Sequence, residues 1–180
     1  MHKFCRIAIA VSLSISGLAA FAETKEENVN LPILAPESQH ATSTKRITAQ
    51  FTRAHYKQIK IDDSLSEQIF DRYIKQLDYA RNVFLAADVQ GFEQYRDDFD
   101  TVIARGKLDV AYQIYNLNLQ RRLERYEFAL SLLENEAPFN FELEESYNFD
   151  REDAERAASV AELNELWRKK VKYDALNLTL

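Results

Sequence analysis

The feature that most constrains the fold is a long apolar stripe in the second half of the chain. Its members recur every three or four residues, which is the spacing of one face of an α-helix. They are Leu108, Tyr112, Tyr115, Leu119, Leu123, Tyr126, Leu130 and Leu133. The stripe predicts a helix of about seven turns, and its mean spacing of about 3.5 residues favours packing against another long helix. Pro138 is expected to end this helix, because proline has no amide hydrogen to donate.

Three shorter helical patterns precede the stripe. The first spans Ser38 to Gln58, with a thin apolar side formed by Ile47, Phe51, Ala54 and Tyr56. The second begins at Ser64, which fits a capping box with Glu67, and its apolar positions are Leu65, Ile69, Phe70, Tyr73, Ile74 and Leu77. The third is expected to have Asp88 as its N-cap, with an inward face of Val89, Phe92, Tyr95, Phe99, Val102 and Ile103.

Glycine is scarce, and its scarcity excludes several kinds of site. After residue 22 the chain has only Gly91 and Gly106. Gly106 follows Arg105, which suits a left-handed end to the third helix with a cation in its last turn. Phosphate-binding loops and dinucleotide-binding turns need clustered glycines, and a nucleophile elbow needs small residues around its serine. The sequence offers none of these.

These patterns together predict an all-α fold, a bundle of about five helices without strands or internal repeats. We expect an extended lead-in at 23–37, a helical domain at 38–135, an acidic connector at 136–158 and a final helix at 159–180. The connector is expected to lie on the surface and to use aromatic anchors, namely Phe139, Phe141, Tyr147 and Phe149. The final helix should begin with a capping box of Ser159 and Glu162 and carry Val160, Leu163, Leu166, Trp167 and Val171. Its end is apolar and lacks a stop signal, which suggests a truncated chain.

The first 22 residues have the layout of a secretory signal peptide. Lys3 and Arg6 precede an apolar run, and Ala20-Phe21-Ala22 provides small residues at a cleavage site. Cleavage after Ala22 is therefore expected, which predicts a periplasmic protein. The run is too short to favour a membrane span. Cleavage removes two cations and no acid, so the formal net charge falls from −6 to −8. This acidity argues against nucleic acid as a partner, because phosphate binding needs a basic face.

Cysteine and histidine give little support to a reactive site. Cys5 is the only cysteine and lies before the apolar run, so the cleaved chain would have no disulfide, no thiol nucleophile and no thiolate metal ligand. His40 and His55 are the remaining histidines, fifteen residues apart. A metal site usually places at least one ligand pair at short helical spacing. We therefore predict no catalytic residue, no cofactor-binding residue and no metal ligand.

The charged residues are expected to serve structure rather than chemistry. Acids occur in pairs, namely Asp62-Asp63, Asp97-Asp98, Glu144-Glu145 and Glu152-Asp153, and we expect them to be solvated. Asp78 fits a turn acceptor and Asp88 fits a helix cap. Basic clusters occur at Arg121, Arg122 and Arg125 and at Arg168, Lys169, Lys170 and Lys172. The first is interleaved with acids, as on a solvated helix face, and the second is expected near a helix end.

Three stretches in order resemble the N-terminal region of periplasmic tail-specific proteases, which are also called carboxy-terminal processing peptidases and belong to a serine protease family. They are FTRAHYKQIKIDDSLSEQIFDRYIKQLDYARNVFLAADVQGFEQYR at 51–96, GKLDVAYQIYNLNLQRRLERYEFAL at 106–130 and ELNELWRKKVKYDALNL at 162–178. The resemblance extends from about Leu31 to the end of the chain. It implies a helical domain that precedes a PDZ domain and a serine protease core.

The resemblance also implies what this chain should lack. Family enzymes cleave periplasmic proteins that end in apolar tails, using a serine activated by a lysine and backbone oxyanion donors. Those groups belong to the later domains, and no catalytic motif of the family matches any position here. The expected role is a non-catalytic scaffold whose partners are the PDZ and protease domains, with a periplasmic or outer-membrane adaptor as a further partner. The alternative is a stand-alone periplasmic helical adaptor or binding module.

Overall fold

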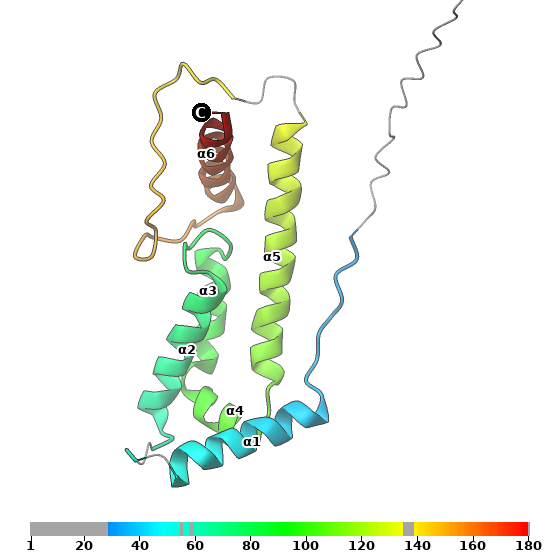
Figure 1. Cartoon of the computed structure of the whole chain (residues 1–180), viewed down its shortest axis with the longest axis vertical. Helices are drawn as coiled ribbons and strands as arrows, with labels where there is room; N and C mark the ends of the chain where they lie inside the picture. The colour runs from blue at the N-terminus through cyan, green and yellow to red at the C-terminus, as the bar shows by residue number, and fades with distance from the viewer. Residues whose placement is uncertain (1–28, 55, 58–59, 135–138, 180) are drawn as a thin grey trace, which may run out of the picture. The chain divides into compact units, whose positions relative to one another are not determined.

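The computed structural model describes residues 29–54, 56–57, 60–134 and 139–179. The chain divides into two units, Met1–Asn30 and Leu31–Leu180, and of the first only Val29 and Asn30 are described. Figure 1 shows the helices of the second unit. They are α1 (Ser38–Arg53), α2 (Asp63–Leu77), α3 (Ala86–Phe92), the 3-10 helix η1 (Glu93–Asp98), α4 (Phe99–Arg105), α5 (Asp109–Leu133) and α6 (Val160–Thr179). The described residues contain no strand, so the prediction of an all-α fold is confirmed.

The core is built from aromatic and aliphatic side chains of α2, the following corner, and the α3–α5 region. Its buried members are Phe70, Ile74, Phe84, Phe92, Phe99 and Ile114. Aromatic rings meet edge to face in two pairs, with ring centres 5.8 Å apart for Phe70 and Phe99 and 5.6 Å apart for Phe84 and Phe92. Such pairs add to the free energy gained by removing each ring from water. The predicted inward faces of the second and third helices are confirmed, since none of their members is exposed.

The predicted cap of the second helix is wrong, and Asp88 caps the third helix from within its first turn rather than as its N-cap. α2 begins one residue earlier than expected, and Asp62 rather than Ser64 is its N-cap, accepting a hydrogen bond of 3.1 Å from the Leu65 amide. Aspartate serves this position as well as serine and adds a negative charge at the positive helix end. Asp88 lies within α3 at its third residue. The predicted third helix is a succession of α3, η1 and α4.

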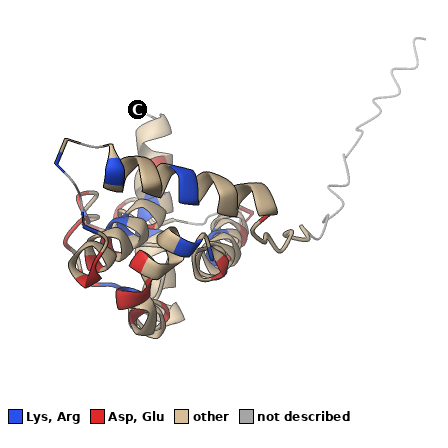
Figure 2. Cartoon of the chain, turned by 90° about the horizontal axis from the view of Figure 1, so that it is seen from below, with Lys and Arg blue, Asp and Glu red and all other residues tan. Residues whose placement is uncertain are grey.

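The end of α4 and its contact with α1 depend on a glycine. Gly106 has φ +64, the left-handed conformation expected from the sequence, and its amide donates to the Val102 carbonyl. A Cβ at this position would lie 2.7 Å from the carbonyl oxygen of Ala41 in α1. α1 ends at Arg53, earlier than predicted, and contains no buried residue. α1 contains basic but no acidic residues, so its ribbon has blue but no red segments in Figure 2.

α5 buries a different face from the one that its apolar stripe predicts. Its buried residues are Ile114, Asn118 and Arg125. Half of the stripe is exposed instead, namely Tyr115, Tyr126, Leu130 and Leu133. The prediction failed because two of the three buried residues are polar, and hydrophobic periodicity cannot register a polar side chain that is buried with hydrogen-bond partners.

α6 contacts α5, and Figure 1 shows it nearly end-on whereas α5 runs vertically, so the two helices cross. The connector leads the chain from α5 to α6. The predicted cap is confirmed, because Ser159 Oγ accepts from the Glu162 amide at 3.2 Å, while Glu162 accepts from the Ala158 amide at 2.8 Å. Leu163 and Val171 are buried as expected, but Val160 is exposed. Phe141 and Phe149 are exposed, so the prediction that they anchor the connector is wrong. Pro138 lies outside the described residues.

Candidate functional site

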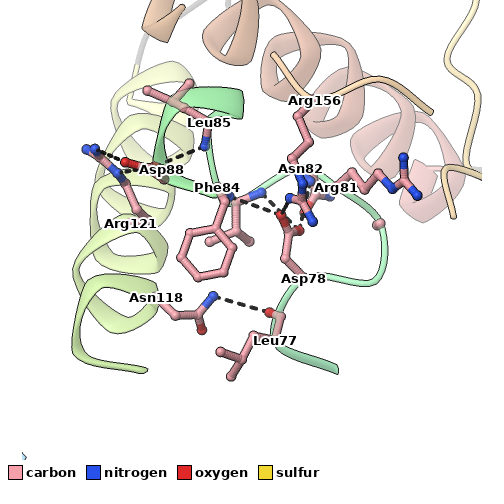
Figure 3. Close-up of polar contacts among 12 residues, drawn as sticks. Leu77, Asp78, Arg81, Asn82, Phe84, Leu85, Asp88, Asn118, Arg121 and Arg156 are labelled. Atoms are coloured by element: carbon pink, nitrogen blue, oxygen red, sulfur yellow. Dashed lines mark hydrogen bonds and ion pairs between the residues drawn. The ribbon is translucent and has the colours of Figure 1, made fainter. Parts of the chain in front are cut away.

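The richest cluster of buried polar groups lies at the corner between α2 and α3 (Figure 3). α2 ends at Leu77, and the chain then turns through residues 78–85 before α3 begins at Ala86. Two aspartates, Asp78 and Asp88, flank the turn, and each is bonded to an arginine from a distant part of the chain. We refer to residues 77–88 as the Asp78 corner.

Asp78 organises the turn by accepting hydrogen bonds from the backbone. The residue is 3% exposed. Its Oδ1 accepts from the amides of Asn82 at 2.9 Å and Val83 at 3.1 Å, and its Oδ2 accepts from the amide of Phe84 at 3.0 Å. Arg156 of the connector donates to the same Oδ2. The predicted role of Asp78 as a turn acceptor is therefore confirmed, and the interaction also ties the connector to the corner.

The turn of the Asp78 corner contains a residue with an unusual backbone conformation. Arg81 has φ 48, and it is the one non-glycine residue with positive φ in the described part of the chain. This conformation costs about 1 kcal/mol for a residue with a Cβ. Arg81 is retained there because its guanidinium reaches across to the connector, where Nη1 donates to the Ala154 carbonyl at 2.9 Å.

Asp88 closes the far side of the corner. Its Oδ2 accepts from the Leu85 amide at 3.0 Å, which satisfies one of the unpaired amides at the start of α3. Arg121 of α5 binds the same carboxylate with two hydrogen bonds of 2.9 Å, from Nε and Nη2. These bonds, together with those to Glu124, raise the pKa of Arg121 above its usual range. Asp88 therefore joins α3 to α5.

The last turn of α2 is held by α5 as well. The Leu77 carbonyl accepts hydrogen bonds from Asn118 Nδ2 at 3.2 Å and from Arg122 Nη2 at 2.7 Å. Carbonyls in the last turn of a helix lack partners within the helix, and a cation near them is favoured by the helix dipole. Buried Asn118 thus has a structural partner, and Figure 3 shows it facing Leu77 from the α5 side.

The hydrogen-bonding capacity of Asp78 is taken up by the chain itself. Each Asp78 oxygen already accepts two hydrogen bonds, and among the described residues no serine or threonine donates to either carboxylate of the corner. A general base needs a lone pair directed at a substrate, and a nucleophile needs an adjacent base. A depression of about 330 Å³ borders the corner, but its charged walls include cations paired within the chain, among them Lys75, Arg96 and Arg156. The described residues hold no group of three or more potential metal ligands.

The comparison with protein families gives the corner its context. A family model described as the tail-specific protease N-terminal domain matches residues 47–180, which include α2 to α6 and the whole Asp78 corner. This chain belongs to the tail-specific protease family. It is 39% identical over 175 residues to a tail-specific protease of Haemophilus influenzae, an alignment that covers 97% of this chain. The chain spans a quarter, 25%, of the length of that relative.

Within this tail-specific protease domain, the histidines flagged in the sequence do not come together as a described site. His40 is half-buried in α1, where its Nδ1 accepts from the Glu37 amide at 3.1 Å and lies 2.9 Å from the Tyr112 hydroxyl. His55 lies outside the described residues. Within the described ranges, no helix is long and apolar enough to cross a bilayer.

The predictions for the two basic clusters, a solvated face for the first and a helix end for the second, are wrong. Arg121 and Arg122 hold the corner, and Arg125 is 4% exposed. The second cluster lies in the middle of α6 rather than at a helix end. Its Arg168 and Lys172 both bind Glu145 of the connector.

Two acids of the connector were also expected to be solvated, and the structure corrects this. Arg168 and then Lys172 lower the pKa of Glu145 to about 2. Glu152 accepts hydrogen bonds from Lys75 and Tyr79 of the α2 end, and its pKa is lowered in turn. Asp97, Asp98 and Glu144 are exposed as predicted. Ionic contacts therefore help to hold the connector, and spacing along the sequence does not reveal them. Of the predicted aromatic anchors, Tyr147 is partly buried, with its ring centre 5.6 Å from that of Tyr173 in α6.

Proposed function

We propose that this chain is a non-catalytic helical support of a tail-specific protease. The main support for the proposal is that the buried charged side chains at the Asp78 corner are bonded to other groups of the chain. Asp78, Asp88 and Arg122 all bond to backbone groups, and Asp78 also binds Arg156 of the connector. These bonds join α2, α3, α5 and the connector into one unit. Such cross-links produce a rigid wall on which other domains can dock, because they fix helix ends that would otherwise fray.

The partners of this support are the PDZ and serine protease domains that the family resemblance implies. The family match and the fourfold greater length of the relative support this assignment. In this account the whole enzyme cleaves proteins that end in apolar tails, and the helical domain limits access and positions the other domains. An adaptor protein that binds the exposed faces of these helices is a further partner of the domain.

The proposal includes export to the periplasm, with cleavage after Ala22. It rests on the signal-like sequence of residues 1–22, which lie outside the described residues. Mass spectrometry of the protein recovered from the periplasm of a bacterial host tests it. The expected product begins at Glu23, and a product that retains residues 1–22 would refute the cleavage.

A domain exchange tests the function itself. In the chimaera, this chain replaces the matching region of the Haemophilus influenzae protease, and degradation of a substrate with an apolar tail is measured. We expect the chimaera to degrade the substrate, a version lacking the region to lose at least tenfold in rate, and the 180-residue chain alone to cleave nothing. Cleavage by the chain alone, or full activity without the region, would overturn the proposal.

A further inference from the structure

An apolar groove of about 530 Å³ lies between α5 and α6, and none of the core cluster residues lines it. Its α5 wall includes Tyr126, Ala129 and Leu133, and its α6 wall includes Trp167, Val171 and Leu178. Both sets follow helical spacing, so each wall is one face of a helix. Two apolar helix faces with a channel between them form a surface on which an amphipathic helix can pack. We call this surface the α5–α6 groove.

One charged residue of this groove lacks the partner that its burial requires. Arg125 lines the groove and is 4% exposed. Its Nη1 donates to Asn164 Oδ1 at 2.5 Å, but its Nε is buried and has no hydrogen-bond partner among the residues that the structure describes. Within the same residues no carboxylate forms an ion pair with it. Burial lowers the pKa of Arg125, as expected for a cation removed from water without an anion.

Other arginines of the chain bind a carboxylate in a way that Arg125 does not. The Nε and Nη2 atoms share one edge of a guanidinium, and a carboxylate can bind both at once. Arg96 presents this edge to Glu93, Arg121 to Asp88, and Arg168 to Glu165. All of these side chains are more exposed than Arg125. In the described part of the chain, the arginine that most needs a carboxylate on this edge has none.

We propose that the α5–α6 groove binds a helix of the remaining tail-specific protease polypeptide, and that Arg125 turns its Nε–Nη2 edge into the groove to bind an Asp or Glu side chain of this helix. The carboxylate must arrive on an apolar segment, because the groove is apolar and Nε is shielded from water. The source of the helix rests on the proposed function, supported by the 25% of the relative that this chain spans. The carboxylate preference of the groove does not depend on that source.

Binding can be measured directly on the 180-residue chain, because Trp167 is its single tryptophan and lines the groove. The probes are two acetylated, amidated helical peptides of leucine and alanine, one with a central Glu and one with Gln instead. We expect the Glu peptide to bind about tenfold tighter, as a charge-assisted hydrogen bond to a shielded cation predicts. Equal affinity for the two peptides would overturn the inference, because a carboxylate would then bind Arg125 no better than an amide does.

Two variants separate a specific contact from general attraction. Arg125→Met should abolish the preference for the Glu peptide. Lys170→Met removes another cation of the groove, one that is paired with Asp174 at 2.5 Å, and should leave the preference intact. Loss of preference in both variants would reduce the effect to net charge and overturn the proposal. If Arg125→Met does not fold, the Nε–H resonance of native Arg125 serves instead. It should shift with the Glu peptide and not with the Gln peptide, and an unchanged resonance would contradict the inference.

The source of the helix has a separate test. In the chimaera the groove should be filled, so a fluorescent Glu peptide should bind at least tenfold more weakly than to the 180-residue chain. Equal binding would refute a helix from the same polypeptide. A dimer of the chain that Arg125→Met dissociates would assign the groove to a second copy and would also refute it. Substrate degradation by the chimaera reports on the proposed function independently of these results.

Discussion

At the scale of single residues, this chain directs buried charge toward its own backbone. Asp78 accepts from three consecutive amides and from Arg156, so a segment without regular structure acquires a fixed shape. Its side chain is fully buried, at 0% exposure. Replacing one member of a buried ion pair leaves the other charged and unpaired, which costs more than the pair itself contributes.

Asp78→Asn should therefore lower the free energy of unfolding by about 3 kcal/mol. The new amide would present its own N–H groups to backbone amides and leave Arg156 without an anion. Denaturant unfolding measures the change. Asp97→Asn is the matched control on an exposed position and should change the value by less than about 0.5 kcal/mol. Similar values for the two variants would contradict the assigned role of Asp78.

The lowered pKa of Glu145 predicts that the contact between the connector and α6 is sensitive to acid. Its pKa is lowered to about 2 by Arg168 and Lys172, so the ionised form stabilises the fold above the ordinary pKa. This contribution is lost as the pH falls through about 2. The free energy of unfolding should therefore decrease from about pH 5 to about pH 2.5. The decrease should be smaller in Glu145→Gln and unchanged in Glu144→Gln, an exposed neighbour. Identical pH profiles for all three proteins would refute the contact.

The sequence predicted the kind of role that these residues have, but not their partners. Asp78 was identified as a turn acceptor because aspartate bonds readily to amides a few residues ahead. Arg156 lies 78 residues further along the chain, and no local pattern connects the two. Arg125 was assigned to a solvated face because acids surround it in sequence, yet tertiary packing leaves it only 4% exposed.

At the scale of secondary-structure elements, two glycines illustrate how context decides a residue's effect. Gly106 ends α4 in a left-handed conformation, and Ala41 of α1 lies against it. Gly91 lies within α3, and a Cβ there would meet nothing within 4 Å. Glycine is required at the first position, whereas at the second it only adds flexibility to the unfolded chain.

Gly106→Ala should destabilise the protein by at least about 1 kcal/mol, because it combines a strained φ with a clash against α1. Gly91→Ala should stabilise it by about 0.5–1 kcal/mol, the usual difference between the two residues inside a helix. Thermal unfolding of both variants measures the contrast. Changes of the same sign would show that the α1–α4 contact is not as described.

The sequence predicted where helices begin and end better than it predicted which face of each helix is buried. The cap at Ser159 and the left-handed end at Gly106 follow from local rules and are confirmed. The division of the third helix into α3, η1 and α4, and the buried face of α5, do not follow from such rules. Both depend on how α2, α5 and the connector pack, and tertiary contacts override a periodicity that is only partly hydrophobic.

At the scale of the whole molecule, the connector and α5 bind opposite sides of the same corner. Arg156 reaches Asp78 from the connector, and Arg121 reaches Asp88 from α5. The candidate site is therefore a junction of elements. The sequence did not predict this junction, because the two arginines lie 78 and 33 residues away from the aspartates that they bind.

The kcat of the chimaera with Asp78→Asn, measured below its melting temperature, tests this central claim most directly. A structural junction predicts a lower melting temperature with kcat within about twofold of the unsubstituted chimaera. A general acid or base predicts a loss of about a hundredfold or more. A loss of that size at a temperature where circular dichroism shows the native fold would contradict the account.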